Sequence, residues 1–305
     1  MSAGAAGAED GGAAETHRGP LRAGERVLAV DGRDRRYLIR LVAGGSFHSH
    51  AGVLEHDDAI GRKEGCLVEA RRREGAGRAR FYLVMRPTLS DVVVKMPRGA
   101  QVIYPKDLAA ILFEADVFPG ARVLEAGVGS GALSMALLRA GASVLGFELR
   151  EDFANRARNN VAEAIGPGAA FTVVQRDVYE GIEERDLDRV VLDLPEPWRV
   201  LPHAALALRP GGILCAYLPT INQTAELRAA LHQHGFVLAS TSELLRRTWH
   251  VEGRSVRPDH RMVAHTGFLT TARLAGLAAA RAGMGGAERV DDEDENEDGA
   301  EPGEG

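Results

Sequence analysis

The sequence predicts an α/β protein in which a small antiparallel β-domain precedes a doubly wound parallel sheet. From about residue 105 onward, apolar runs alternate with helical patterns, which is typical of parallel βαβ units. Before residue 87, short β-rich runs are separated by glycine-containing turns, which is typical of antiparallel strands. The chain has 305 residues, which is enough for about two domains of roughly 150 residues each.

The chain divides by composition into four expected segments. Residues 1–19 and 283–305 are rich in Gly, Ala and acidic residues and lack aromatic ones, so they cannot bury enough apolar surface to offset the entropy of ordering. We expect both to be disordered tails. The β-domain is expected over residues 20–86, with the runs RVLAV, RYLIRLV, CLVEARRR and FYLVMRP, and the α/β domain over residues 87–282.

Within the α/β domain, the expected strands are, in order, ARVLEAG, SVLGFEL, FTVVQRD, DRVVLDL and GGILCAYL. The expected helices are GALSMALLRAG, REDFANRARNNVAEAIG, one from about residue 199, and TAELRAALHQHG. After residue 235 we expect further strands, most clearly MVAHTGFLTTARL. Trp249 is expected to be a core aromatic residue.

The composition, with 45% apolar and 26% charged residues, is ordinary for a soluble globular protein. No stretch approaches the run of about 18 apolar residues that a membrane span needs, and the N-terminus lacks the pattern of a signal peptide. We therefore expect a cytoplasmic protein with no membrane partner. Cys66 and Cys215 lie 149 positions apart, which favours neither a disulfide framework nor a thiolate metal site.

The net charge of −6 hides an uneven distribution. Residues 291–305 hold nine acids and no base, whereas residues 18–86 hold 15 basic and 9 acidic residues. A basic domain of this kind suits a partner rich in phosphate groups. A well-solvated arginine-rich surface explains the charge equally well at this stage.

A glycine loop formed by Gly127, Val128, Gly129, Ser130 and Gly131 follows a predicted strand and opens a helix, a position where backbone N–H groups approach a ligand. The same residues, with Ala132, also satisfy the fingerprint of a dinucleotide-binding loop. Glu148 is placed to bind a ribose, whether the ligand is a dinucleotide or another nucleoside cofactor.

Two further acids distinguish a dinucleotide from a nucleoside cofactor that carries a positive charge. Glu125 lies two positions before the first glycine, where it would attract a cation and repel a pyrophosphate. Asp177 ends the third strand, where an adenine amino group could donate to it. Three acids around one loop favour a sulfonium and a ribose over a dinucleotide. The loop, with an acid closing strand two and another closing strand three, resembles the class I S-adenosylmethionine (SAM) methyltransferases, which implies a Rossmann-like sheet.

The fourth strand ends in Asp193-Leu194-Pro195-Glu196-Pro197-Trp198 at the edge that faces the ligand in an open α/β sheet. We therefore expect Asp193 near the transferred methyl group. Nucleobase amino-group methyltransferases carry an Asp/Asn-Pro-Pro-aromatic motif here, from which this sequence departs, so transfer to an exocyclic nitrogen is not favoured.

Several longer motifs resemble the bacterial and archaeal tRNA (adenine-58-N1)-methyltransferase family. They are FHSHAGVLEHDDAIGRKEG at 47–65, RGAQVIYPKD at 98–107, DLPEPW at 193–198 and RTWHVEGRSVRPDHRMVAHTGFL at 247–269. The resemblance covers residues 20–275 and implies a homotetramer, SAM as methyl donor, and N1 of an adenine in the tRNA T-loop as acceptor. It also implies that SAM is bound by Gln101, Glu125, Gly127, Val128, Gly129, Ser130, Gly131, Glu148, Phe153, Asp177, Val178 and Asp193.

The same resemblance implies that Asp193 is catalytic and that Tyr104 lines the base pocket. Adenine N1 already carries a free lone pair, so no strong base is needed. A carboxylate at Asp193 could accept from the adenine amino group, orient N1 and stabilise the developing positive charge. The adenine must be extruded from the tRNA elbow, and Tyr104 could stack on it.

For RNA contact we expect Arg71, Arg72 and Arg73 in the β-domain, and Arg254, Arg257 and Arg261 near the end of the chain. His48, His50 and His56 have no nearby carboxylate or cysteine that completes a ligand set, so no metal is expected.

Three rival functions remain. One is a SAM methyltransferase acting on a protein carboxylate or a small molecule. Another is a non-catalytic tRNA-binding subunit, which would be expected to lack the glycine loop or Asp193. A nicotinamide dehydrogenase is disfavoured by Glu125.

Overall fold

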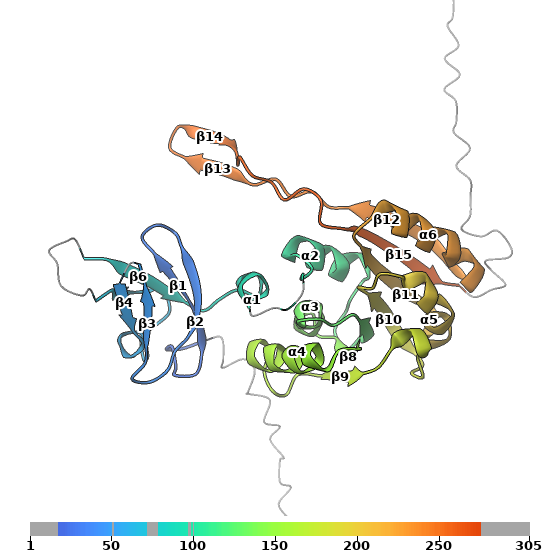
Figure 1. The fold of residues 1–305 in the computed structure, drawn as a ribbon, viewed down its shortest axis with the longest axis horizontal. Helices are drawn as coiled ribbons and strands as arrows, with labels where there is room; N and C mark the ends of the chain where they lie inside the picture. The colour runs from blue at the N-terminus through green and yellow to red at the C-terminus, as the bar shows by residue number, and fades with distance from the viewer. Residues whose placement is uncertain (1–17, 51, 72–78, 97–98, 100, 276–305) are drawn as a thin grey trace, which may run out of the picture.

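The computed structural model describes residues 18–50, 52–71, 79–96, 99 and 101–275. It consists of an N-terminal β-domain and a larger α/β domain (Figure 1). Nearly all of both predicted tails lies outside the described residues. Among the described residues, no helix has the length and hydropathy that a membrane span needs.

The N-terminal domain contains a four-stranded antiparallel sheet in the order β2-β1-β6-β5 and a separate hairpin, β3-β4. Its core includes the rings of Tyr37, Phe47 and Tyr82, which pack at tilted or edge-on angles. The strands are β1 (Arg26–Asp31), β2 (Arg36–Arg40), β3 (Ser46–Ser49), β4 (Gly52–Glu55), β5 (Cys66–Glu69) and β6 (Phe81–Met85).

The α/β domain is built on a seven-stranded sheet in the order β12-β15-β11-β10-β7-β8-β9. The five strands from β11 to β9 are parallel, whereas β15 is antiparallel to both of its neighbours. The predicted α/β fold is thus confirmed. The strands are β7 (Arg122–Ala126), β8 (Ser143–Glu148), β9 (Phe171–Gln175), β10 (Leu187–Leu192), β11 (Leu208–Leu218), β12 (Phe236–Glu243) and β15 (Phe268–Leu274).

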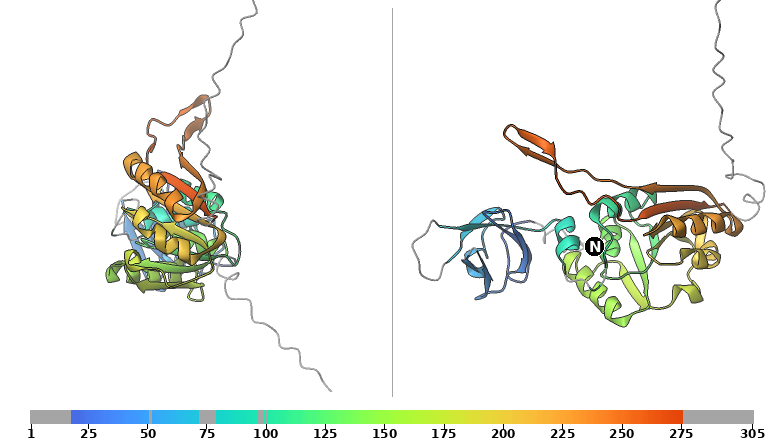
Figure 2. Two further views of the ribbon diagram at one scale, coloured as in Figure 1. Left: turned by 90° about the vertical axis from the view of Figure 1, so that its right-hand side faces the viewer. Right: turned by 45° about the horizontal axis from the view of Figure 1, so that its top comes forward.

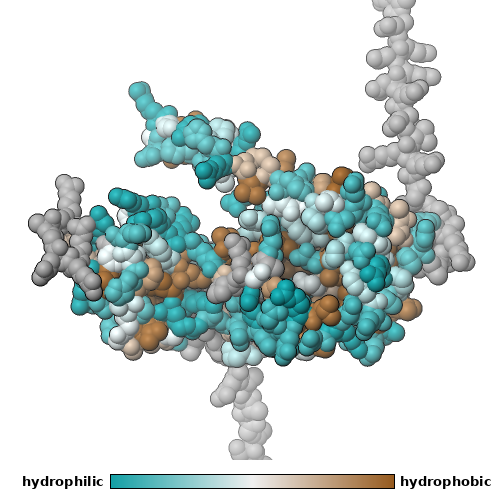
Figure 3. Space-filling view, viewed as in Figure 1, coloured by the Kyte–Doolittle hydropathy of each residue, from teal (hydrophilic) through white to brown (hydrophobic). Residues whose placement is uncertain are grey.

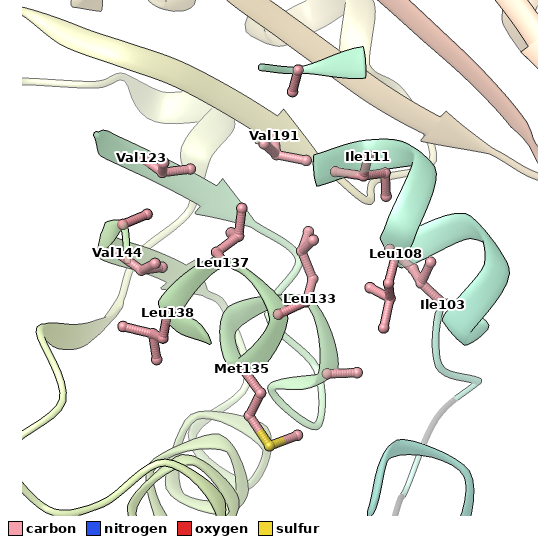
Figure 4. Packing of buried hydrophobic residues seen from close by; sticks show 14 of the residues in the cluster. Ile103, Leu108, Ile111, Val123, Leu133, Met135, Leu137, Leu138, Val144 and Val191 are labelled. Carbon is pink, nitrogen blue, oxygen red and sulfur yellow. The ribbon is translucent and has the colours of Figure 1, made fainter. Parts of the chain in front are cut away.

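Helices cover both faces of this sheet because alternate strand residues point to opposite sides. Val123 and Val191 pack with α2 and α3 on one face (Figure 4), whereas Leu124 and Val190 belong to the core under α5 and α6. The helices are α1 (Leu89–Lys95), α2 (Pro105–Glu114), α3 (Ala132–Arg139), α4 (Glu151–Ala164), α5 (Leu201–Ala207) and α6 (Ile221–Leu231).

The two domains meet beside α1, which begins with a capping box formed by Thr88 and Asp91. Lys95 Nζ at the end of α1 donates to the carbonyl oxygen of Arg36 in β2 at 2.8 Å. Glu163 in α4 forms ion pairs with Arg26 and Arg40 of the β-domain. Charged and polar contacts therefore join the two domains at this junction.

Residues 244–267, between β12 and β15, form a projecting arm (Figures 1 and 2). Its hairpin pairs β13 (Trp249–Glu252) with β14 (Ser255–Pro258). Val251 is 71% exposed and Trp249 57% exposed, so the prediction that Trp249 is a core residue is wrong. Exposed Leu245, Met262 and Val263 lie in the part of the arm next to the domain, where Figure 3 shows hydrophobic surface.

Candidate active site at the carboxyl edge of the sheet

The glycine loop runs from the end of β7 to the start of α3, and other segments pack closely against two of its glycines. Gly127 has a φ of 87°, and a Cβ at this position would lie 2.2 Å from the carbonyl oxygen of Asp193. Gly131 has a φ of 81°, and its Cβ would lie 3.3 Å from the Cα of Ala157 in α4. Glycine is needed at both positions because left-handed backbone and close packing coincide there.

Gly129 and Glu148 join the loop to the end of β8. The Gly129 N–H donates to Glu148 Oε2 at 2.9 Å, and the Arg150 N–H donates to Glu148 Oε1 at 3.0 Å. A Cβ on Gly129 would meet no atom within 4 Å, so this part of the loop borders open space. Each oxygen of a carboxylate has two acceptor sites, so Glu148 keeps capacity for ligand hydroxyl groups.

Glu125 lies in β7 with no exposed surface. Its Oε2 accepts a hydrogen bond from Ser134 Oγ at 2.6 Å, whereas Oε1 has no partner among the described residues. Burial raises the pKa of Glu125 to about 8, and the nearby charges of Asp193 and Glu148 contribute to the rise. An unpaired buried carboxylate oxygen of this kind favours a cationic ligand group beside it.

Asp193 follows β10 directly, and its N–H donates to the carbonyl oxygen of Ala126 at 2.9 Å. This bond places Asp193 against the first residue of the glycine loop, as the close approach to Gly127 also shows. No described residue donates a hydrogen bond to its carboxylate. Burial raises the pKa of Asp193 to about 7, so the group titrates near neutral pH.

The residues after Asp193 form a turn held by neighbouring elements. Gln223 Nε2 in α6 donates to the carbonyl oxygen of Pro195 at 2.9 Å, and the Glu196 N–H donates to Tyr179 Oη at 3.3 Å. Trp198 packs against the core under α5. Contacts with α6 and Tyr179 therefore fix the turn that follows Asp193, and this limits the movement of Asp193.

At the end of β9, Asp177 accepts from the Tyr179 N–H through Oδ1 at 2.9 Å. This bond caps the short 3-10 helix Val178–Glu180, in which Val178 is buried. Asp177 thus has a structural role in addition to the one predicted for it.

Phe153 is buried in the first turn of α4, with the guanidinium carbon of Arg150 4.0 Å and that of Arg156 5.5 Å from the ring centroid. A Cβ on Gly99 would lie 2.9 Å from its Cε1. Packing of an adenosine on this ring therefore requires neighbouring groups to move. Gln101 is exposed, in the segment that leads to α2.

Tyr104 is the residue before α2, and its carbonyl oxygen accepts from the N–H groups of Asp107 and Leu108, each at 2.9 Å. Its side chain is half-buried.

Tyr217, near the end of β11, is a site residue that the sequence analysis did not find. Burial raises its pKa, and the charge of the neighbouring Asp107 adds to the rise. Its Oη donates to Asp107 Oδ2 at 3.3 Å. A polar aromatic residue near the carboxyl end of a buried strand was the available signal.

The predicted RNA-binding residues lie on two separate elements. Arg71 is exposed in the β-domain and forms an ion pair of 3.2 Å between its Nη2 and Asp58 Oδ2; Arg72 and Arg73 lie outside the described residues. Arg254, Arg257 and Arg261 are all exposed on the arm.

The three histidines of the β-domain do not form a cluster of metal ligands. The described part of the chain contains no other group of His, Cys, Asp or Glu residues that could hold a metal ion. His56 is buried, and its Nδ1 accepts from the Val42 N–H at 3.0 Å. His48 Nε2 lies 3.1 Å from Ser46 Oγ.

Comparisons with known proteins agree with the geometry. Residues 80–260 match the family described as tRNA methyltransferase complex GCD14 subunit, and residues 19–68 match the TrmI-like N-terminal family. A Thermus thermophilus protein named tRNA (adenine(58)-N(1))-methyltransferase TrmI is 38% identical over 81% of this chain and 96% of its own length. A Methanocaldococcus jannaschii TrmI, named for adenines 57 and 58, is 35% identical over 81% of this chain and 94% of its own.

Two solved structures superpose on most of this chain. The Thermotoga maritima SAM-dependent O-methyltransferase superposes with a TM-score of 0.78 at 31% identity, covering 87% of this chain and 97% of that one. The Aquifex aeolicus tRNA (m1A58) methyltransferase TrmI has a TM-score of 0.71 at 30% identity, covering 83% and 98%.

Proposed function

Because the chain belongs to the tRNA (adenine-58-N1)-methyltransferase family, we propose that it transfers a methyl group from SAM to N1 of adenine 58 in the T-loop of tRNA. The observation that carries the proposal is the match, over nearly their full length, to relatives named for this reaction. The arrangement of Asp193 against the glycine loop supports it.

The residues at the glycine loop fit SAM. Glu125 Oε1, which has no hydrogen-bond partner among the described residues, favours a methyl donor that carries a positive charge. The open space beside Gly129 lies next to Glu148. When bound, SAM supplies an electrophilic methyl group on a sulfonium. In this proposal, Glu148 accepts from the ribose hydroxyls and Asp177 from the adenine amino group, while Val128, Ser130, Val178, Phe153 and Gln101 complete the binding site.

On the acceptor side, we assign Asp193 to the adenine amino group. Its carboxylate has no hydrogen-bond donor among the described residues, so it is available to accept one from the substrate. Holding that amino group orients the N1 lone pair and stabilises the positive charge that methylation creates on the ring. Tyr104 stacks on the extruded base.

For tRNA binding, we assign the basic β-domain, including Arg71, Arg72 and Arg73, and the exposed arginines of the arm. Changing Arg71, Arg72 and Arg73 to Gln is expected to weaken tRNA binding and to flatten its salt dependence by up to about one unit for each phosphate that is no longer neutralised. Filter binding at several salt concentrations measures this. Arg228→Gln, on the exposed face of α6, is the control. If the salt dependence of tRNA affinity is unchanged in the triple variant, these arginines are solvent-exposed residues that do not contact tRNA.

We further propose that the protein is cytoplasmic and forms a homotetramer. The arm supports self-association, because Trp249, Val251 and Val256 are 57–71% exposed on a hairpin that makes little contact with its own domain (Figure 1). Sedimentation velocity tests the oligomeric state, and a monomer would contradict it.

The decisive experiment maps the product. Purified protein is incubated with labelled SAM and unmodified tRNA, and the methylated base is located by nuclease digestion and mass spectrometry. We expect N1-methyladenosine at position 58, and no transfer to a tRNA with guanine at that position. The O-methyltransferase name of one structural relative represents the main alternative. Label in a protein carboxylate or a small molecule, with none in tRNA, would favour that class.

A further inference from the structure

A largely buried polar cluster beside the proposed adenine pocket is centred on Lys106 in the first turn of α2. The Lys106 ammonium group donates to Asp107 Oδ1 at 2.7 Å, to the Leu244 carbonyl oxygen at 2.7 Å and to Thr266 Oγ1 at 2.6 Å. The side chains of Lys106 and Asp107 are only 10% and 3% exposed. All three ammonium donors of Lys106 are therefore used inside the protein.

Asp107 completes the cluster through its other carboxylate oxygen. Oδ2 accepts from Thr266 Oγ1 at 2.8 Å and from Tyr217 Oη at 3.3 Å. Thr266 thus accepts from the lysine and donates to the aspartate. Connected hydrogen bonds in a buried site strengthen one another, so loss of one member affects the others.

The cluster joins segments that lie far apart in the sequence. Leu244 directly follows β12 and Thr266 lies just before β15, so Lys106 binds both ends of the arm. Tyr104 lies two residues before Lys106, and its carbonyl oxygen accepts from the Asp107 N–H. Tyr217, near the carboxyl end of β11, joins the cluster through Asp107.

An ion pair at this position fixes geometry rather than adding stability. Apolar side chains hold buried elements together at least as well as a buried ion pair does, because both charges must be desolvated. An ammonium group with three fixed acceptors instead specifies direction and distance. The cluster therefore sets the relative positions of α2, the end of β11 and the arm.

Building on the proposed function, we propose that Lys106 is a positioning residue for methyl transfer. It holds the start of α2, and hence Tyr104, against both ends of the arm, so that the adenine pocket is fully shaped only when the arm is anchored. Lys106 contacts neither SAM nor adenine in this assignment, because its donors are all occupied.

The test measures single-turnover methyl transfer at saturating SAM and tRNA for Lys106→Met, Lys106→Arg and Thr266→Val. We expect Lys106→Met to lower the rate by about 10- to 100-fold, the effect of misplacing reacting groups by about 1 Å. SAM affinity, measured by calorimetry, should stay within about twofold because the glycine loop is untouched. Lys106→Arg should restore most of the rate, which a requirement for bulk alone does not explain.

The matched control is Lys95→Met, because Lys95 Nζ also donates to a carbonyl oxygen of a distant segment but lies at the domain junction. Its rate at saturating tRNA should equal that of the wild type. Lys106→Met and Thr266→Val combined should lower the rate by less than the product of their separate effects, since both disrupt one cluster.

A folded Lys106→Met variant with the wild-type rate would overturn the inference. If that variant does not fold, Thr266→Val decides, because it removes one hydroxyl group: a reduced rate with unchanged SAM affinity supports the inference, and a wild-type rate overturns it. Wild-type protein that does not methylate adenine 58 at all would instead refute the proposed function.

Discussion

The two halves of the carboxyl edge are built in different ways. The centre of the SAM half, at β7 and β8, is formed by the backbone of the glycine loop and by side chains that lie within 23 positions of one another, from Glu125 to Glu148. The acceptor half consists of Asp193 and of the region around α2, β11 and the arm, where side chains meet across 110 to 160 positions.

Because of this difference, the two halves tolerate different amino-acid substitutions. A site made by backbone packing fails when a single Cβ is added, whereas a site made by side-chain hydrogen bonds loses function in steps as partners are removed. The SAM half should therefore control affinity for the donor, and the acceptor half should control the rate of transfer. Substitutions in each half test that division.

The largest expected effect is that of Asp193→Ala. Methyl transfer should fall by about a thousandfold or more while SAM affinity stays within about tenfold, because an interaction that is strongest in the transition state affects turnover selectively. Single-turnover kinetics and titration calorimetry measure the two quantities. Near-normal turnover would remove Asp193 from the mechanism and end the division between the halves.

Gly127→Ala should break the SAM half. The added Cβ would lie 2.2 Å from the Asp193 carbonyl oxygen, on a backbone with a φ of 87°. We expect a loss of about 2–5 kcal/mol in the free energy of unfolding, together with loss of SAM binding. Gly129→Ala is the control: its Cβ meets nothing, so only the strain of a positive φ remains, about 1–2 kcal/mol. Equal effects in a denaturant titration would contradict the packing argument.

Glu148→Ala should weaken SAM by about 1.5 kcal/mol or more, the scale of hydrogen bonds to a charged group. The transfer rate at saturating SAM should change little, because Glu148 lies wholly in the SAM half. Unchanged SAM affinity would mean that the carboxylate serves only to hold the Gly129 and Arg150 N–H groups.

The smallest effect, counted per pH unit, is a pH dependence of SAM affinity. The pKa of Glu125 is raised from 4.5 to about 8 by burial, so protonation stabilises the protein without ligand. That contribution is complete below about pH 4.5 and is lost as the pH rises through about 8.

A cation beside Glu125 favours the carboxylate, so SAM binding should release a proton and tighten by up to about tenfold per pH unit from pH 6 to 8. Calorimetry in two buffers of different ionisation enthalpy counts the protons, and Asp193→Asn removes the contribution of Asp193. Glu125→Gln should abolish most of the release; an affinity independent of pH in the wild type would contradict this assignment.

How far the sequence predicts the molecule follows from the same division. The glycine loop, Glu125 and Glu148 are readable because a strand, a turn and a helix succeed one another locally, and Asp177 and Asp193 because strand ends meet at one edge. The cluster of Lys106, Asp107, Tyr217 and Thr266 is not readable, because nothing local pairs residues so far apart.

The arm shows a second limit of sequence reasoning. Trp249 and Val251 alternate with polar residues as they would in a half-buried strand, but alternation does not specify what covers the apolar face. The insertion of β15 between β11 and β12 is likewise set by long-range pairing.

The place of β15 also sets when the domain can be completed during synthesis. β11 ends at Leu218, but its partner on that side begins only at Phe268. At about 5–20 residues per second, that edge of β11 remains unpaired on the ribosome for roughly 3–10 s. Among the described strands, β12 pairs only with β15, and Thr266 is made in the same interval. A nascent chain thus carries its entire glycine loop while one sheet edge is still open to pairing with a neighbouring chain, which makes this interval the one in which misassembly competes with folding.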